Sequence, residues 1–136
     1  MAASFLAEID VETHEIVYIN AGHNSPILRR SSGTIERLST GGPPFGIPAF
    51  TDETRYPSGR VQLGSGDLLF IFTDGVVEAV NDADEAYGEA RLLQGVERAP
   101  TKSANEVLAR VMGDVNTFVG PARQHDDITC LALRVI

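Results

Sequence analysis

Two apolar runs flanked by acidic residues constrain the fold of this sequence most strongly. The first run leads into Asp74, and the second follows Asp126 and Asp127. Short apolar runs bounded by turn-forming residues are typical of buried strands, so we predict strands at 68–73 and 127–135. Acidic residues at two strand tips can converge on one point. Their carboxylate oxygens suit a hard cation such as Mg²⁺ or Mn²⁺.

The N-terminal third of the sequence predicts two hairpins. Apolar and polar residues alternate at 4–11 and 15–21, and a short turn separates the two segments. In the first of these strands we expect one face to carry Phe5, Ala7, Ile9 and Val11. A second pair of segments, 26–30 and 34–38, flanks a glycine-containing turn.

The middle of the sequence is rich in residues that break regular structure. Six glycines and prolines between 39 and 50 predict a loop of fixed shape that is neither helix nor strand. Residues 52–63 read as an extended, partly polar segment at a sheet edge.

Helical patterns dominate after residue 74. We predict a short helical turn at 75–80 and a helix at 89–98. Ser103 and Glu106 form a capping-box pattern at the start of a third helix, which Gly120 ends. Antiparallel strands followed by helices indicate an α+β fold with the helices on an outer face.

Composition excludes several classes of protein. The 136 residues carry a net charge of −8, which disfavours nucleic acid or an anionic membrane as a partner. No run approaches the roughly 18 apolar residues of a membrane span. The single cysteine, Cys130, cannot form an internal disulfide and is expected to pack in the core. A cytoplasmic protein is the resulting expectation.

The acidic motifs resemble those of a known family. Thr-Asp-Gly-Val-Val-Glu-Ala at 73–79 and Asp-Asp-Ile-Thr at 126–129 are similar to the metal-binding signatures of metal-dependent serine/threonine phosphatases, the PPM family, in its SpoIIE/RsbU branch. Three further matches occur in the family's order: Tyr-Ile-Asn-Ala-Gly-His-Asn-Ser-Pro at 18–26, Gly-Gly-Pro-Pro-Phe-Gly-Ile at 41–47 and Gly-Asp at 66–67.

The resemblance implies a PPM β-sandwich flanked by helices, here incomplete at its N-terminus. The family's N-terminal Gly-Asp motif, whose aspartate bridges two metal ions, is absent. We therefore interpret residues 1–136 as the C-terminal part of one phosphatase domain, or as a naturally shortened relative. The exposed sheet edges of such a fragment predict self-association.

The resemblance also implies roles for individual residues. Asp74 and Asp126 are the expected ligands of Mn²⁺ or Mg²⁺, with Gly75 allowing close approach and Asp127 orienting Asp126 by hydrogen bonding. Asp74 equally suits the N-cap of a helix, and Asp126 with Asp127 equally suits a surface turn. His23 is a candidate proton donor or phosphate contact, or a residue that only holds its loop.

Other ionisable residues carry weaker signals. We expect Glu78 to be an exposed helix acid and Asp67 to be a turn residue. Both His14 and His125 are expected in solvated turns.

Two hypotheses follow for function. In the first, the complete domain hydrolyses phosphoserine or phosphothreonine on a bacterial signalling protein such as an anti-sigma-factor antagonist, with little or no turnover from the isolated chain. In the second, the chain is a non-catalytic, degenerate phosphatase-like module that binds a partner. The absent bridging aspartate is the feature that separates them.

Overall fold

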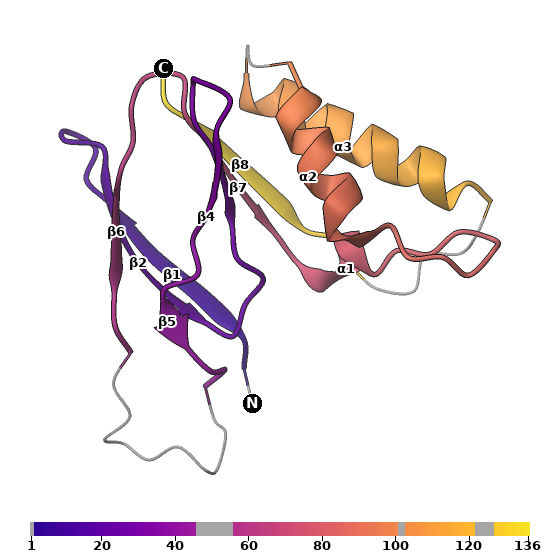
Figure 1. The fold of residues 1–136 in the computed structure, drawn as a ribbon, viewed down its shortest axis with the longest axis horizontal. Coiled ribbons are helices and arrows are strands. Elements are labelled where there is room, and N and C mark those ends of the chain that lie inside the picture. The colour runs from indigo at the N-terminus through magenta and orange to yellow at the C-terminus, as the bar shows by residue number, and fades with distance from the viewer. Residues whose placement is uncertain (1, 46–55, 101–102, 122–126) are drawn as a thin grey trace.

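The computed structural model describes residues 2–45, 56–100, 103–121 and 127–136. Its elements follow one another in two groups, strands first and then helices, before a final strand returns to the sheet (Figure 1). In chain order the elements are β1 (Ser4–Ile9), β2 (Glu15–Ala21), β3 (Ile27–Arg29), β4 (Ile35–Arg37), β5 (Gly41–Gly42), β6 (Gly59–Gln62), β7 (Leu68–Phe72), α1 (Asp74–Val77), α2 (Gly88–Arg98), α3 (Ala104–Val119) and β8 (Cys130–Arg134).

The strands form two sheets. One has the order β1-β2-β5 with β6 also paired to β2, and the other has the order β4-β3-β7-β8. Every pairing is antiparallel except that of β2 with β5. Figure 1 shows α2 and α3 beside the second sheet, on the side away from the first. The predicted α+β sandwich with flanking helices is confirmed.

Strand β7 separates two hydrophobic clusters. Leu68, Phe70 and Phe72 pack with the buried faces of α2 and α3, whereas Leu69 packs between the two sheets. Alternate residues of a strand point to opposite faces, so a strand covered on both faces must be apolar throughout. This explains the continuous apolar run from which the strand was predicted.

The long helix begins and ends where the sequence predicted. The Ser103 hydroxyl oxygen accepts a hydrogen bond from the Glu106 backbone N–H at 3.1 Å. Gly120 closes the helix with φ = 59°, in the left-handed region that glycine tolerates. Between these ends Val107, Val111 and Val115 are buried against the sheet.

Several sequence-based boundaries were wrong. The glycine- and proline-rich segment 39–50 was predicted to contain no strand, yet β5 pairs there in parallel with the end of β2. The last strand begins at Cys130 instead of residue 127, so Asp127, Ile128 and Thr129 precede β8 and are not part of it. Val11 lies beyond β1 in an exposed turn, so it does not share the face of Phe5.

Part of the predicted edge segment 52–63 forms β6, which pairs with β2 alone among the described strands. The remainder of that segment up to residue 55 lies outside the described residues. No helix in the described part of the chain is both long enough and apolar enough to cross a membrane.

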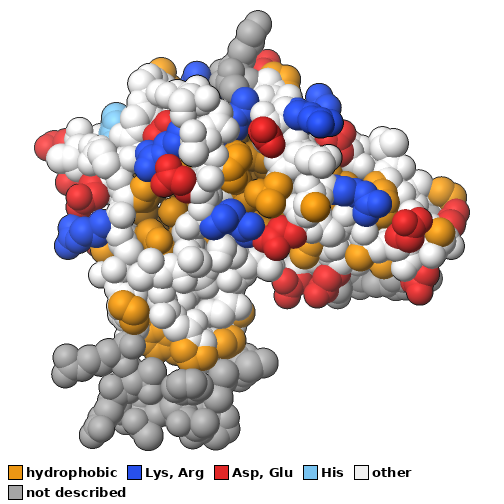
Figure 2. Space-filling view, viewed as in Figure 1, with side chains coloured by type: hydrophobic (Ala, Val, Ile, Leu, Met, Phe, Trp, Pro, Cys, Tyr) orange, Lys and Arg blue, Asp and Glu red, His pale blue; other side chains and the backbone are white. Residues whose placement is uncertain are grey.

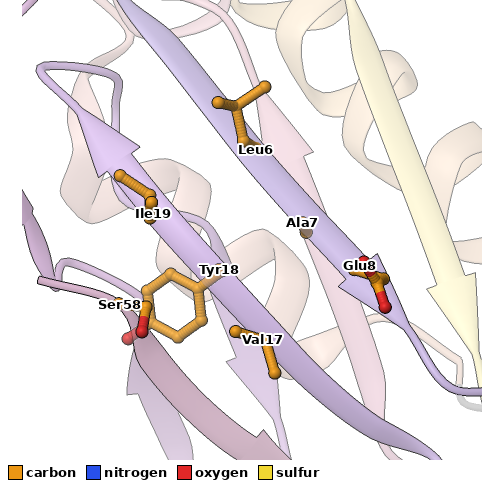
Figure 3. A pocket seen from close by; sticks show the side chains of 7 residues that line it. All are labelled: Leu6, Ala7, Glu8, Val17, Tyr18, Ile19 and Ser58. Carbon is orange, nitrogen blue, oxygen red and sulfur yellow. The ribbon is translucent and has the colours of Figure 1, made fainter. Parts of the chain in front are cut away.

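The outer face of the first sheet carries apolar side chains. Leu6 pairs with Ile19 across β1 and β2, and Glu8 pairs with Val17. Cross-strand partners share one face of a sheet, and Figure 3 shows these four side chains along the two strands. Leu6 is 54% exposed, so no described element covers this face as α2 and α3 cover the second sheet.

The turn into β7 is held by a buried carboxylate. Asp67 accepts hydrogen bonds from the backbone N–H groups of Ser31 and Gly64, both at 2.8 Å, and from Arg30 at 2.9 Å. Burial alone would raise the pKa of Asp67, but these hydrogen bonds and the Arg30 charge outweigh it and hold the pKa below its ordinary value. The predicted turn role of Asp67 thus has a physical basis.

Because the folded-state pKa of Asp67 is lowered, its carboxylate stabilises the fold above the unfolded pKa of about 3.9. That contribution is lost as the pH falls through the lower folded pKa. We predict that Asp67→Asn lowers the free energy of unfolding by about 1–3 kcal/mol at pH 7. Urea denaturation should show that the difference in free energy of unfolding between Asp67→Asn and the unaltered protein shrinks toward pH 2. Exposed Asp82 supplies the control Asp82→Asn, and an unchanged difference across this pH range would contradict the assignment.

Candidate metal centre

The end of β7 and the start of β8 lie at the same edge of the second sheet. The two strands are antiparallel neighbours whose last pair joins Phe72 to Cys130. Hydrogen bonds continue one residue further: the Thr73 N–H donates to the Thr129 carbonyl at 3.1 Å, and the Thr129 N–H donates to the Thr73 hydroxyl oxygen at 3.1 Å. This ladder brings the two acidic motifs together.

Gly75 sets the distance between the motifs. A Cβ atom at this position would lie 2.1 Å from the carbonyl oxygen of Asp127, far closer than atoms can approach. Only glycine therefore lets α1 pack directly against the backbone of Asp127 and Ile128. The sequence predicted that Gly75 lets backbone and water approach a bound ion, which stays a prediction. What the structure shows is the close approach of the Asp127 backbone to Gly75.

Asp74 is an exposed residue at the start of α1. The N-cap alternative for Asp74 was wrong, because the N-cap is Thr73 and Asp74 is the first helical residue. One carboxylate oxygen, Oδ1, accepts a hydrogen bond of 2.5 Å from the Asn24 side-chain amide. Asn24 thus fixes the orientation of Asp74 and places the Asn-Ala-Gly-His-Asn segment beside it.

That segment is itself held by buried Asn20. The Asn20 amide donates to the Leu38 carbonyl at 3.2 Å, and its side-chain oxygen accepts the His23 backbone N–H at 2.9 Å. Gly22 has φ = 71° and passes so close to Pro44 that a Cβ atom would overlap the proline ring. The resulting tight turn presents Asn24 toward Asp74.

His23 contacts its own loop in this arrangement. Its ring Nδ1 lies 2.8 Å from the Asn24 carbonyl oxygen, so an Nδ1-protonated ring donates a hydrogen bond there. This matches the loop-holding alternative for His23. Its role as a proton donor or phosphate contact stays a prediction.

The remaining candidates are dispersed. Asp127 is exposed next to Gly75, whereas Asp126 and His125 lie outside the described residues. Glu78 is exposed at the end of α1, and His14 is an exposed turn residue with φ = 62°. Within the described ranges no three His, Cys, Asp or Glu side chains gather closely enough to hold a metal ion. Asp74 and Asp127 alone therefore do not complete a metal centre.

Reasoning from sequence did not identify Asn24, Thr73 or Thr129 as residues of the site. The contact between Asn24 and Asp74 spans 50 residues, and no local pattern encodes it. The only available signal was that Asn24 closes the Asn-Ala-Gly-His-Asn run that the resemblance had already selected.

Comparison with known proteins places the whole chain in one group. The family described as "Stage II sporulation protein E (SpoIIE)" matches residues 1–136. Protein IcfG of Synechocystis sp. is 28% identical over 132 residues, which is 97% of this chain and 20% of that protein. Phosphoserine phosphatase RsbP of Bacillus subtilis is 31% identical over 71 residues, covering 52% of this chain and 17% of that protein.

Solved structures support the same fold. The SiaA-PP2C domain of Pseudomonas aeruginosa superposes with a TM-score of 0.81 at 18% identity, covering 98% of this chain and 52% of that one. A SpoIIE structure from Bacillus subtilis, comprising the PP2C phosphatase domain and a fragment of its regulatory domain, gives 0.78 at 20% identity, covering 98% and 37%. The chain thus spans about a fifth of the length of the curated relatives and about half of the length of the SiaA domain. The resemblance drawn from the motifs is confirmed.

We predict that Gly75→Ala destabilises the junction between β7 and β8. Its methyl group would force α1 away from the Asp127 backbone, and overpacking of this kind costs about 1–3 kcal/mol in free energy of unfolding. Gly113 supplies a matched control, because nothing lies within 4 Å of a Cβ atom there and Gly113→Ala lies inside α3. That control should stabilise the protein by about 0.5–1 kcal/mol. Equal effects of the two substitutions in urea denaturation would contradict the close approach.

Proposed function

Because the chain belongs to the SpoIIE family, we propose that it contributes the C-terminal part of a metal-dependent protein phosphatase domain. The reaction is hydrolysis of phosphoserine or phosphothreonine in a protein substrate. One observation carries the proposal: the close packing of Gly75 on Asp127, which unites the two acidic motifs at one sheet edge.

Three features support the assignment to part of a larger domain. The chain spans 52% of the SiaA domain structure. Apolar Leu6 lies exposed on the outer face of the first sheet, and β1 pairs with β2 alone among the described strands. An open strand edge beside an apolar face is a template for further chain, either from the same domain or from a second copy. Light scattering of the isolated 136-residue chain tests for the second case.

The acidic residues fit Mn²⁺ or Mg²⁺ by their chemistry. Both ions prefer carboxylate oxygens. Asp74 offers an exposed carboxylate that Asn24 orients. Asp127 is also exposed, and its backbone packs against Gly75, the residue that follows Asp74. We assign Asp74 and Asp126 as ligands, with Asp127 and Asn24 as residues that orient them. A further acidic ligand from outside this chain would complete a two-metal centre.

In this mechanism the chain supplies positioning and negative charge. Asn24 holds the Asp74 carboxylate at the strand end, and Gly75 keeps the Asp127 segment against it. The bound cations would supply Lewis-acid polarisation of the phosphoryl oxygens and activation of water for in-line attack. Cys130 is not a nucleophile in this scheme, because burial raises the pKa of its thiol to about 11 and keeps it protonated.

The substrate is proposed from the relatives. RsbP is named a phosphoserine phosphatase, and another structural neighbour joins RsbU and RsbW domains in one Mycobacterium tuberculosis protein. We therefore propose that the substrate is a phosphorylated signalling protein in bacterial sigma-factor regulation, such as an anti-sigma-factor antagonist. A cytoplasmic location follows from such a partner.

A non-catalytic role is the alternative. The observation that favours it is the absence, among the described residues, of three potential metal ligands in one cluster. A degenerate module of this kind would bind its partner through the same fold without turnover. Phosphate release separates the two functions.

We predict that Asp74→Ala and Asp126→Ala in the full-length protein each lower turnover by more than about 100-fold. Each removes a carboxylate assigned to the cation, whereas loss of an orienting residue typically costs only about 10–100-fold. Asn24→Ala and Asp127→Ala should fall in that smaller range. Phosphate release from a phosphoserine protein in the presence of Mn²⁺ measures all four.

Asp82→Ala is the matched control, because Asp82 is an exposed acidic residue in the turn between α1 and α2. Equal losses of turnover in Asp82→Ala and Asp74→Ala would contradict the assignment of Asp74 to the metal site. Turnover by the isolated 136-residue chain equal to that of a longer protein would instead refute the partial-domain proposal. No release by either form would favour the binding module.

A further inference from the structure

A shallow groove of about 280 Å³ runs between α2 and α3, on helices that the proposed metal centre does not use. Its lining includes three arginines, although the chain as a whole has a net charge of −8. Figure 2 shows basic, acidic and apolar side chains side by side over this helical part of the surface. The concentration of arginine in one groove is therefore a local feature against an acidic background.

The basic residues follow from helical spacing. Gly95 follows Arg91 by four positions and Arg98 follows Gly95 by three, so the three residues share one face of α2. On α3, Arg110 and Asp114 are likewise four residues apart and form an ion pair at 3.3 Å. Asp114 partly neutralises Arg110, which leaves Arg91 and Arg98 as the main positive charges.

Arg91 is held in place before any ligand arrives. Its Nη1 atom donates to the carbonyl oxygens of Ala86 at 2.7 Å and Tyr87 at 2.9 Å. The guanidinium carbon lies 4.4 Å from the centre of the Phe118 ring, within the range of a cation–π contact. An arginine fixed in this way loses little side-chain entropy on binding an anion. Within the described residues its Nε and Nη2 groups donate no hydrogen bond, so they can pair with such an anion.

Gly95 keeps the floor of the groove open. It is buried, and a Cβ atom there would lie 3.4 Å from Asp114 Oδ2 and 3.6 Å from the Tyr87 hydroxyl. A larger side chain would fill the space between the two arginines of α2. The groove thus depends on a small residue at its centre.

We propose that this groove binds an acidic peptide segment of a partner protein. Charge complementarity selects carboxylates, because guanidinium groups pair with them through parallel hydrogen bonds. Arg98 follows Arg91 by seven positions in α2, which corresponds to about 10 Å along the helix axis. An extended peptide rises about 3.3 Å per residue, so acidic residues at positions i and i+3 match this spacing.

The test uses a fluorescein-labelled peptide with glutamates at i and i+3 and the full-length protein. Fluorescence anisotropy should show saturable binding that a glutamine-for-glutamate peptide reduces by at least about tenfold. Arg98→Glu should weaken binding by a similar factor. Raising the salt concentration from 50 to 200 mM should weaken it further, since exposed charges are screened over about 8–10 Å.

Arg60→Glu is the matched control. Arg60 lies on β6 in the other sheet, 68% exposed and paired with Glu15, so the same change of charge occurs away from the groove. It should leave peptide binding within about twofold, as for distant independent sites. Arg91 is unsuitable for this comparison because it also packs on Phe118.

Three results would overturn the proposal. Equal weakening by Arg60→Glu and Arg98→Glu would mean that net charge alone attracts the peptide. Displacement of the peptide by inorganic phosphate at low millimolar concentration would mean that the groove takes a single anion. Failure to bind the peptide, together with salt-sensitive dimerisation that Arg98→Glu abolishes, would assign the groove to a second copy of the chain.

Discussion

Burial of β7 on both faces is the constraint on which the rest of the structure depends. One face of this strand packs on the helices through Phe70 and Phe72, and the other packs between the sheets through Leu69. A strand in this position must pair on both edges, and it does so with β3 and β8. The antiparallel pairing with β8 is what returns the chain from α3 to the end of β7. The proximity of Asp74 and Asp127 is a consequence of core packing before any ligand binds.

This dependence explains why much of the candidate site could be predicted from sequence. Two apolar runs predict the two strands, and the acidic residues beside them mark the strand ends. Asp74 follows the first run, and Asp126 with Asp127 precedes the second. Their convergence needed only the assumption that the two strands are antiparallel neighbours, which the structure confirms as far as Asp127. The long helix was equally readable, because Ser103 and Gly120 mark its ends with local hydrogen bonding and a local backbone angle.

The features that the sequence did not predict depend on distant partners. The pairing of β5 with β2 places Gly41 against the Asn20 carbonyl, and no local sequence pattern predicts that these two residues are neighbours. The contact of Asn24 with Asp74 depends on the turn at Gly22, which packs on Pro44. The arginine groove likewise needs the packing of α3 on α2 around Gly95. In each case the arrangement is determined by tertiary contacts and cannot be predicted from local propensity.

We propose that a divalent cation binds where the ends of β7 and β8 meet. Paramagnetic broadening of backbone amide NMR signals by substoichiometric Mn²⁺ in the full-length protein tests it most directly. We expect the signals of Gly75, Val76 and Ile128 to broaden first, while those of Gly66 and Val135, at the opposite end of the same strands, persist. Broadening centred instead on the acidic turn at 82–85, or spread evenly over the protein, would contradict the claim.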